Sequence, residues 1–87
     1  MIELLKVKTT SKPNLVATAI ANILRNQKKL NIQAVGAGSI NQAVKALAIA
    51  RSHLVLSGND LCCYPIFKEV VIENENKTAI CFITSLV

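Results

Sequence analysis

Apolar and polar positions alternate with two different periods along this chain, and each change of period marks an element. Residues 2–8 alternate imperfectly, which predicts a first strand. Over residues 13–29 the apolar positions recur every three or four residues, which predicts an amphipathic helix that begins at a proline. A second strand is expected at residues 32–35, and a second helix from residue 39 to 53 or slightly beyond.

The remainder of the chain has the period of strands. Leu56–Asp60 is typical of a turn, and residues 61–72 predict a long strand that lies at an edge or carries a bulge, because Pro65 cannot donate to a ladder. A polar hairpin tip is expected at residues 73–76, before a last strand at 78–84. The order predicts an α/β two-layer βαβαββ domain over residues 1–87, with two helices on one face of a four-stranded mixed sheet.

The second predicted helix is apolar almost all round, which is typical of a helix that is buried on more than one side. A domain of 87 residues offers little core to cover it, and 52% of its residues are apolar. We therefore expect a homodimer whose interface includes Ala46, Leu47 and Ile49.

The stretch from Ile32 to Lys45 combines a short strand, a tight glycine loop and a helix start. The first turn of a helix directs unpaired N–H groups outward, which suits an anion or a phosphate. The loop at residues 11–13 also follows a strand and opens a helix, so both loops should leave the same edge of the sheet. The residues predicted to meet nucleic acid there are Lys12, Asn14, Gly36, Ala37, Gly38, Ser39, Asn41, Gln42 and Lys45.

Charge is unevenly distributed along the chain. Residues 1–59 hold eight basic side chains against Glu3 alone, whereas residues 60–87 carry a net charge of −2. A polyanion should therefore meet the first two thirds of the chain. The three aromatic side chains, Tyr64, Phe67 and Phe82, lie on strands predicted to be internal, which favours contacts with the phosphate backbone over stacking on bases.

The sequence contains no recognisable group of catalytic, cofactor-binding or metal-binding residues. Ser39 has no base with a third orienting group, and Asn41 occupies the third glycine position of a dinucleotide fingerprint. His53 is interpreted as a helix C-terminal cap or a packed residue. Cys62, Cys63 and Cys81 lack CxxC spacing and are interpreted as small core side chains. With no apolar run of membrane-spanning length and no signal peptide, we expect a cytoplasmic, soluble protein without a cofactor, a metal or a membrane partner.

Several segments together resemble the stage V sporulation protein S family. They are Leu4–Val7, Ser11–Asn14 with Val16–Ala17, the long motif Ile32–Ala46 with Ala48–Arg51, Ser57–Leu61 and Thr78–Ile80. The resemblance implies an Alba-like fold, a dimer, binding to DNA or RNA and a regulatory role in bacterial sporulation or development. It also implies that Lys12 lies in a DNA-contacting loop and that Gly36 and Gly38 lie in a second one.

Some positions depart from the pattern that this resemblance implies. Alba-type proteins place a basic hairpin in the minor groove, whereas the tip here is Glu73–Asn76 with only Lys77 beside it. Thr10 stands where the sporulation family carries a lysine, and the charge moves to Lys12. Two alternatives remain open: a protein-interaction module that regulates a partner without nucleic acid, and a small anionic ligand at Gly36–Ser39.

Overall fold

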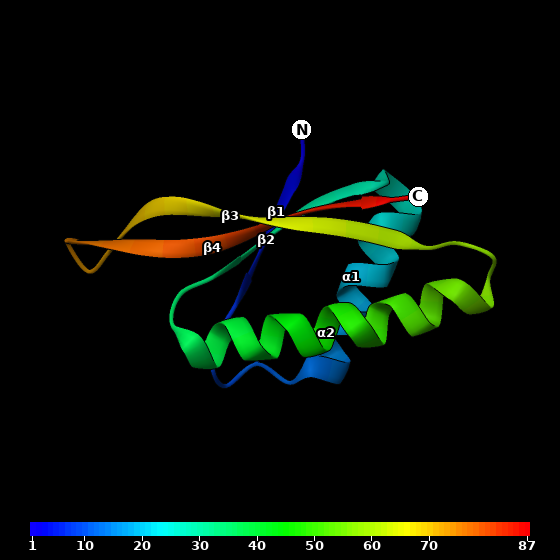
Figure 1. Ribbon diagram of the computed structural model, residues 1–87, viewed down its shortest axis with the longest axis horizontal. Helices are drawn as coiled ribbons and strands as arrows, with labels where there is room; N and C mark the ends of the chain where they lie inside the picture. The colour runs from blue at the N-terminus through cyan, green and yellow to red at the C-terminus, as the bar shows by residue number, and fades with distance from the viewer.

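The computed structural model describes residues 1–87 and contains six elements in the predicted order (Figure 1). The strands are β1 (Glu3–Val7), β2 (Lys29–Ala34), β3 (Leu61–Ile72) and β4 (Glu75–Leu86), and the helices are α1 (Pro13–Gln27) and α2 (Ala37–Leu56). The sheet has the order β1-β2-β4-β3. β1 and β2 are parallel and the other two pairings are antiparallel, so the predicted mixed sheet is confirmed.

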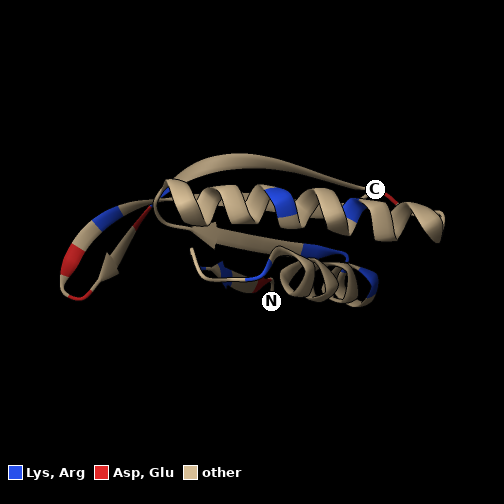
Figure 2. Cartoon of the chain, turned by 90° about the horizontal axis from the view of Figure 1, so that it is seen from below, with Lys and Arg blue, Asp and Glu red and all other residues tan.

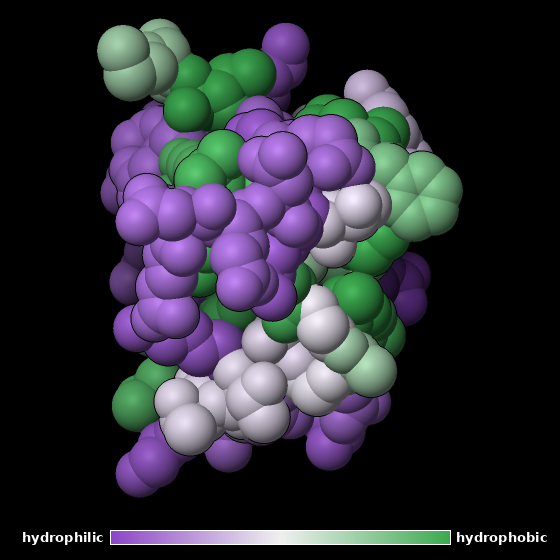
Figure 3. All heavy atoms as spheres, turned by 90° about the vertical axis from the view of Figure 1, so that its left-hand side faces the viewer, coloured by the Kyte–Doolittle hydropathy of each residue, from purple (hydrophilic) through white to green (hydrophobic).

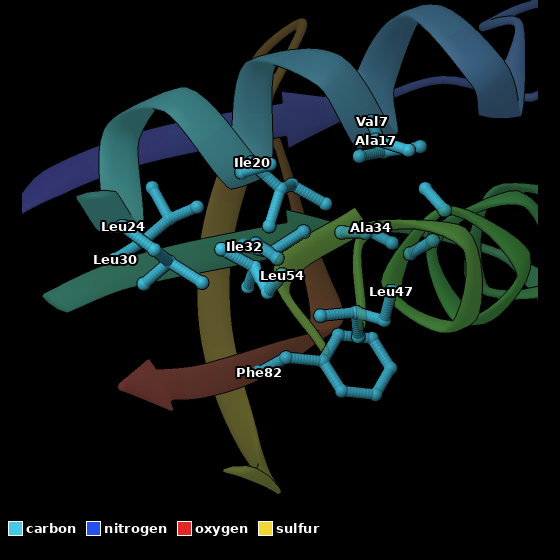
Figure 4. Close-up of a cluster of buried hydrophobic side chains, with 14 residues drawn as sticks. Val7, Ala17, Ile20, Leu24, Leu30, Ile32, Ala34, Leu47, Leu54 and Phe82 are labelled. Atoms are coloured by element: carbon cyan, nitrogen blue, oxygen red, sulfur yellow. The ribbon is translucent and has the colours of Figure 1, made fainter. Parts of the chain in front are cut away.

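Both helices pack on one face of the sheet. The core between them contains side chains from the helices and every second side chain of the strands (Figure 4). Ile32 of β2 and Phe82 of β4 are paired neighbours on this face, and Figure 4 places Leu47 of α2 beside Phe82. The core cluster holds 14 buried residues from β1, β2, β4 and both helices. The opposite face of the sheet carries no helix and is called the open face below.

Lys28 ends the first helix earlier than the periodicity predicts. Its φ is 69°, and its backbone N–H donates to the carbonyl of Leu24 at 2.9 Å, which is a left-handed helix cap. The chain turns sharply there, so β2 begins at Lys29 rather than at residue 32. The second helix is longer than predicted and covers residues 37–56.

The β3–β4 hairpin turns through only two residues. Glu73 and Asn74 both have positive φ, at 51° and 65°, as a tight mirror-image turn requires. β4 therefore begins at Glu75, three residues before the predicted start at 78, and the predicted four-residue tip is corrected to two. Asn74 tolerates this conformation without glycine, because its short polar side chain stabilises left-handed geometry.

Strand β3 lies at the edge of the sheet, which confirms the position expected for Pro65. The same placement corrects the expectation for the aromatic side chains. Tyr64 is 60% exposed and Phe67 is 80% exposed, while Phe82 on the internal strand β4 is buried. Edge position also exposes Cys62 and Cys63, so only Cys81 is the core cysteine that the sequence predicts.

Candidate nucleic-acid interface

The loops before α1 and α2 leave the same edge of the sheet, as predicted. Their strands are parallel neighbours, and Val7 at the end of β1 pairs with Ala34 at the end of β2. The two loops also touch, since a Cβ added to Gly38 would lie 3.0 Å from a side-chain carbon of Thr9. We call residues 8–14 and 35–39 together the loop edge.

Gly36 sets the direction of α2. Its φ of 87° and ψ of 154° belong to a region that only glycine readily adopts. Ile40 makes the first helical hydrogen bond, with its N–H donating to the carbonyl of Gly36 at 3.0 Å. The N–H groups of Ala37, Gly38 and Ser39 therefore have no partner within the helix, and no acidic side chain lies in the first turn. This helix start has the polarity that suits an anion.

Ser39 and Gln42 hold the loop edge together instead of facing solvent. Ser39 is 5% exposed, and its hydroxyl lies 3.2 Å from the hydroxyl of Thr9. The Gln42 amide donates to the carbonyl of Ser11 at 2.9 Å and to that of Thr9 at 3.4 Å. Their side chains are thus committed to contacts inside the protein. These contacts position the loop before α1, and the contact of both residues with nucleic acid stays a prediction.

That loop is further fixed by its own backbone. The N–H of Lys8 donates to the Ser11 hydroxyl at 2.8 Å, and the N–H of Ser11 donates back to the Lys8 carbonyl at 3.0 Å. Lys12 occupies the N-cap of α1, and its carbonyl accepts hydrogen bonds from two N–H groups of the first turn. The Lys12 side chain is exposed and has no polar partner. Asn14, one residue beyond Pro13, is exposed as well.

Asn41 and Lys45 lie one turn apart on α2, and both are exposed. Lys45 is six residues beyond Ser39, which places it about 9 Å further along the helix axis. It therefore lies on α2 beyond the loop edge, three residues after Gln42, whose amide contacts the loop before α1.

Two lysines that the sequence reasoning left out of the site border the loop edge. Lys6 and Lys8 line a pocket of about 320 Å³ together with Thr9, Gln33 and Ser39. Their alternation along β1 already predicted a shared face, but only the tertiary structure brings that face against the loops.

The hairpin tip carries the opposite charge, as its sequence indicates. Figure 2 shows acidic residues at this end of the molecule, and the end-on view in Figure 3 shows hydrophilic side chains over much of its centre. The Lys77 ammonium lies 3.5 Å from the Glu75 carboxylate, which offsets its charge. Glu69 accepts a hydrogen bond from Thr78 at 2.7 Å. The hairpin has therefore none of the basic character of a minor-groove arm.

The residues predicted for the dimer interface are largely buried within the single chain. Ala46 is 0% and Leu47 is 7% exposed within the single chain, because α2 packs them against α1 and the sheet. Ile49 is half-buried against the same core. The exposed apolar side chains of α2 and β3 include Val44, Phe67 and Val71.

No three side chains of His, Cys, Asp or Glu lie close enough to hold a metal ion. His53 lies exposed near the end of α2, and its backbone carbonyl accepts a long hydrogen bond of 3.4 Å from Arg25. None of the helices combines the length and the apolar character that crossing a membrane requires.

Comparison with known proteins decides the family. The sequence profile described as stage V sporulation protein S matches residues 3–86. The chain belongs to the stage V sporulation protein S family. Members of this family have a sporulation-related role, and the family is of a regulatory type.

Among solved structures, the fold is similar to that of Alba from Thermoplasma volcanium. The TM-score is 0.60 with 20% sequence identity, and the match covers 95% of this chain and 96% of that chain. The predicted Alba-like fold is therefore confirmed.

Proposed function

We propose that this protein is a cytoplasmic regulator of bacterial sporulation or development that binds DNA or RNA as a homodimer, chiefly through backbone phosphates. The observation that carries the proposal is the loop edge, where the loops before two helices touch, neither helix has an acidic residue in its first turn, and Lys12 is exposed. Phosphates are bound by this combination of backbone N–H groups, helix dipole and lysine.

The proposed nucleic-acid contacts are the exposed members of the predicted set. The backbone N–H groups of residues 37–39 would donate hydrogen bonds to one phosphate, and Lys12 would neutralise that phosphate or its neighbour. Asn41 and Lys45 extend the contact along α2. Because backbone N–H groups and lysines mainly contact phosphates, which carry no sequence information, binding should depend little on sequence.

A salt titration tests the proposal. Affinity for a 20-base-pair DNA duplex and for the matching RNA duplex should fall as salt rises, with a slope in log affinity of roughly −0.9 for each phosphate neutralised on DNA. Absence of binding at low salt to both duplexes would defeat the proposal, and so would binding without a negative slope.

The dimer is proposed to form through the apolar strip of Val44, Phe67 and Val71. Phe67 and Val71 are four residues apart and therefore project from the same face of β3. No strand pairs with β3 on its outer side. Exposed apolar surface on an edge strand is a pairing site that soluble proteins normally cover. Sedimentation should give a dimer for the native chain and a monomer for Phe67→Asp. Leu15→Asp, which changes an equally apolar exposed residue on α1, should leave the dimer intact.

The alternative function, a module that binds a partner protein and no nucleic acid, rests on the same strip and on the acidic hairpin. Lys12→Glu combined with Lys45→Glu separates the two. The nucleic-acid proposal expects loss of polyanion binding with an intact dimer, whereas the alternative expects no functional change.

A further inference from the structure

The open face of the sheet presents side chains in rows that cross all four strands. Strand pairing places Leu4, Asn31, Ile83 and Tyr64 in one such row. The row before it contains Lys29, Ser85 and Cys62. Neighbouring strands are about 4.8 Å apart, so Asn31 and Tyr64 stand roughly 10 Å from each other with Ile83 between them.

These two rows form a pocket of about 240 Å³. Tyr64, Ile2 and Ile83 supply apolar surface to this pocket. Lys29 contributes a cation and Asn31 contributes an amide. Pockets for drug-sized ligands are usually about 300–1,000 Å³, so this one suits a single planar ring with a polar edge. The Tyr64 ring is the only aromatic side chain on the open face and is free to stack.

The charge of the open face complements a polyanion. Alternation along the strands places five of the ten basic residues on it, and Glu75 is the one carboxylate of the strands that shares it, already beside Lys77. The five are Lys6, Lys8, Lys29, Lys68 and Lys77. Phosphates on either side of a bound ring would therefore meet lysines.

We propose that the open face binds single-stranded nucleic acid, with one base stacked on Tyr64, its edge facing the Asn31 amide, and the adjacent phosphate at Lys29. A flat aromatic platform inside a basic groove is the general means by which proteins hold unpaired bases. A duplex cannot use it, because its bases are already stacked and paired. The inference rests on the proposed nucleic-acid function, but its pocket contains no residue of the loop edge.

Fluorescence anisotropy with 20-nucleotide single-stranded DNA and RNA of one sequence gives the first test, beside a DNA duplex of equal length. Tyr64→Ala should weaken single-strand binding by about 5- to 150-fold, which is the usual effect of removing one stacking ring. Tyr64→Phe, which keeps the ring, should bind single strands as the native chain does. Duplex binding should be unaffected by either change and should fall in Lys12→Glu. The DNA and RNA arms show which of the two strands is preferred.

Two adjacent cysteines provide a second test on the unmodified protein. Cys62 lines the pocket, whereas Cys63 points to the opposite face of β3. A bound single strand should slow the alkylation of Cys62 by iodoacetamide and leave the rate at Cys63 unchanged. Peptide mass spectrometry after short exposures measures both rates in one sample.

The outcomes separate this inference from the proposed function. Duplex binding without single-strand binding, single-strand binding that Tyr64→Ala leaves intact, or equal protection of both cysteines would each overturn the inference alone. Protection of Cys62 that follows protein concentration instead of added oligonucleotide would assign the open face to a second copy of the chain and overturn it too. Single-strand binding lost in Tyr64→Ala, with no duplex binding at all, would support the inference and refute the role of the loop edge.

Discussion

Replacing Lys12 with glutamine should lower the affinity for duplex DNA by an amount that follows from the geometry of the loop edge. Lys12 is exposed at the N-cap of α1 and makes no side-chain hydrogen bond or ion pair, so its removal should take away one phosphate contact without disturbing the fold. A homodimer presents two copies. At roughly 0.9 for each contact, the slope of log affinity against log salt should become shallower by about 1.8.

This change of slope fixes the loss of affinity at each salt concentration. The two proteins should bind equally near 1 M salt, where the electrostatic contribution vanishes. At 0.1 M salt the Lys12→Gln protein should bind about 60-fold more weakly, which is ten raised to the power 1.8. If the chain acts as a monomer, the change in slope is about 0.9 and the loss about 8-fold. The size of the effect therefore also reports how many copies engage the duplex.

The assay is an anisotropy titration of a labelled duplex at four or more salt concentrations, with circular dichroism to verify the fold. Lys77→Gln is the matched control, because it removes the same charge from the hairpin tip, where Glu75 already offsets it. An unchanged slope in Lys12→Gln would refute the assignment of phosphate contacts to the loop edge. An equal change in Lys77→Gln would refute the argument that the hairpin takes no part.

Three further substitutions test the local arguments. Leu47→Ala should lower the free energy of unfolding by about 2–5 kcal/mol in a denaturant titration, because Leu47 belongs to the core of the single chain; a shift of the dimer equilibrium alone would contradict this. Gly36→Ala should cost about 1–3 kcal/mol in the same titration, since φ is 87° there, and native stability would contradict the strain. The hydrogen bond from Arg51, with that from the Leu61 N–H, lowers the pKa of Asp60. Asp60→Asn should therefore melt at a lower temperature than the native chain at pH 7. That gap should close as the pH falls below about 4 and through the folded-state pKa, where the carboxylate gains its proton; a gap that persists in acid would assign the effect elsewhere.

The sequence predicted the elements and the meeting of the two loops because both depend on local signals. Hydrophobic period identifies strands and helices, and parallel strands joined by a helix must release their loops at one edge. Gly36 and Pro13 mark the helix starts closely for the same local reason. Lys28 escaped prediction because a lysine in the left-handed region leaves no compositional signal.

Strand order is what the sequence pattern could not supply. The apolar run of β3 is typical of an internal strand, while Pro65 allowed either an edge or a bulge, and the actual place of β3 at the edge leaves Tyr64 and Phe67 exposed. The apolar second helix was interpreted as evidence of a partner chain for a related reason. Its alanines allow α1 and α2 to approach closely, so Ala46 and Ala50 are fully buried without a second subunit. Ser39 and Gln42 were assigned to ligand binding by position, and only the folded loops show that Thr9 and Ser11 engage them.

Because side chains alternate along β3, the number of residues in the strand decides which face each side chain occupies. Tyr64 lies on the open face and Phe67 on the helix side, so the even-numbered residues of β3 belong to one surface and the odd-numbered residues to the other. Inserting or deleting a single residue between Leu61 and Tyr64 would exchange the two faces. Tyr64 and Lys68 would then turn to the side of the apolar strip, and Phe67 would turn to the open face. Variation in this strand is therefore expected as substitutions or as paired insertions.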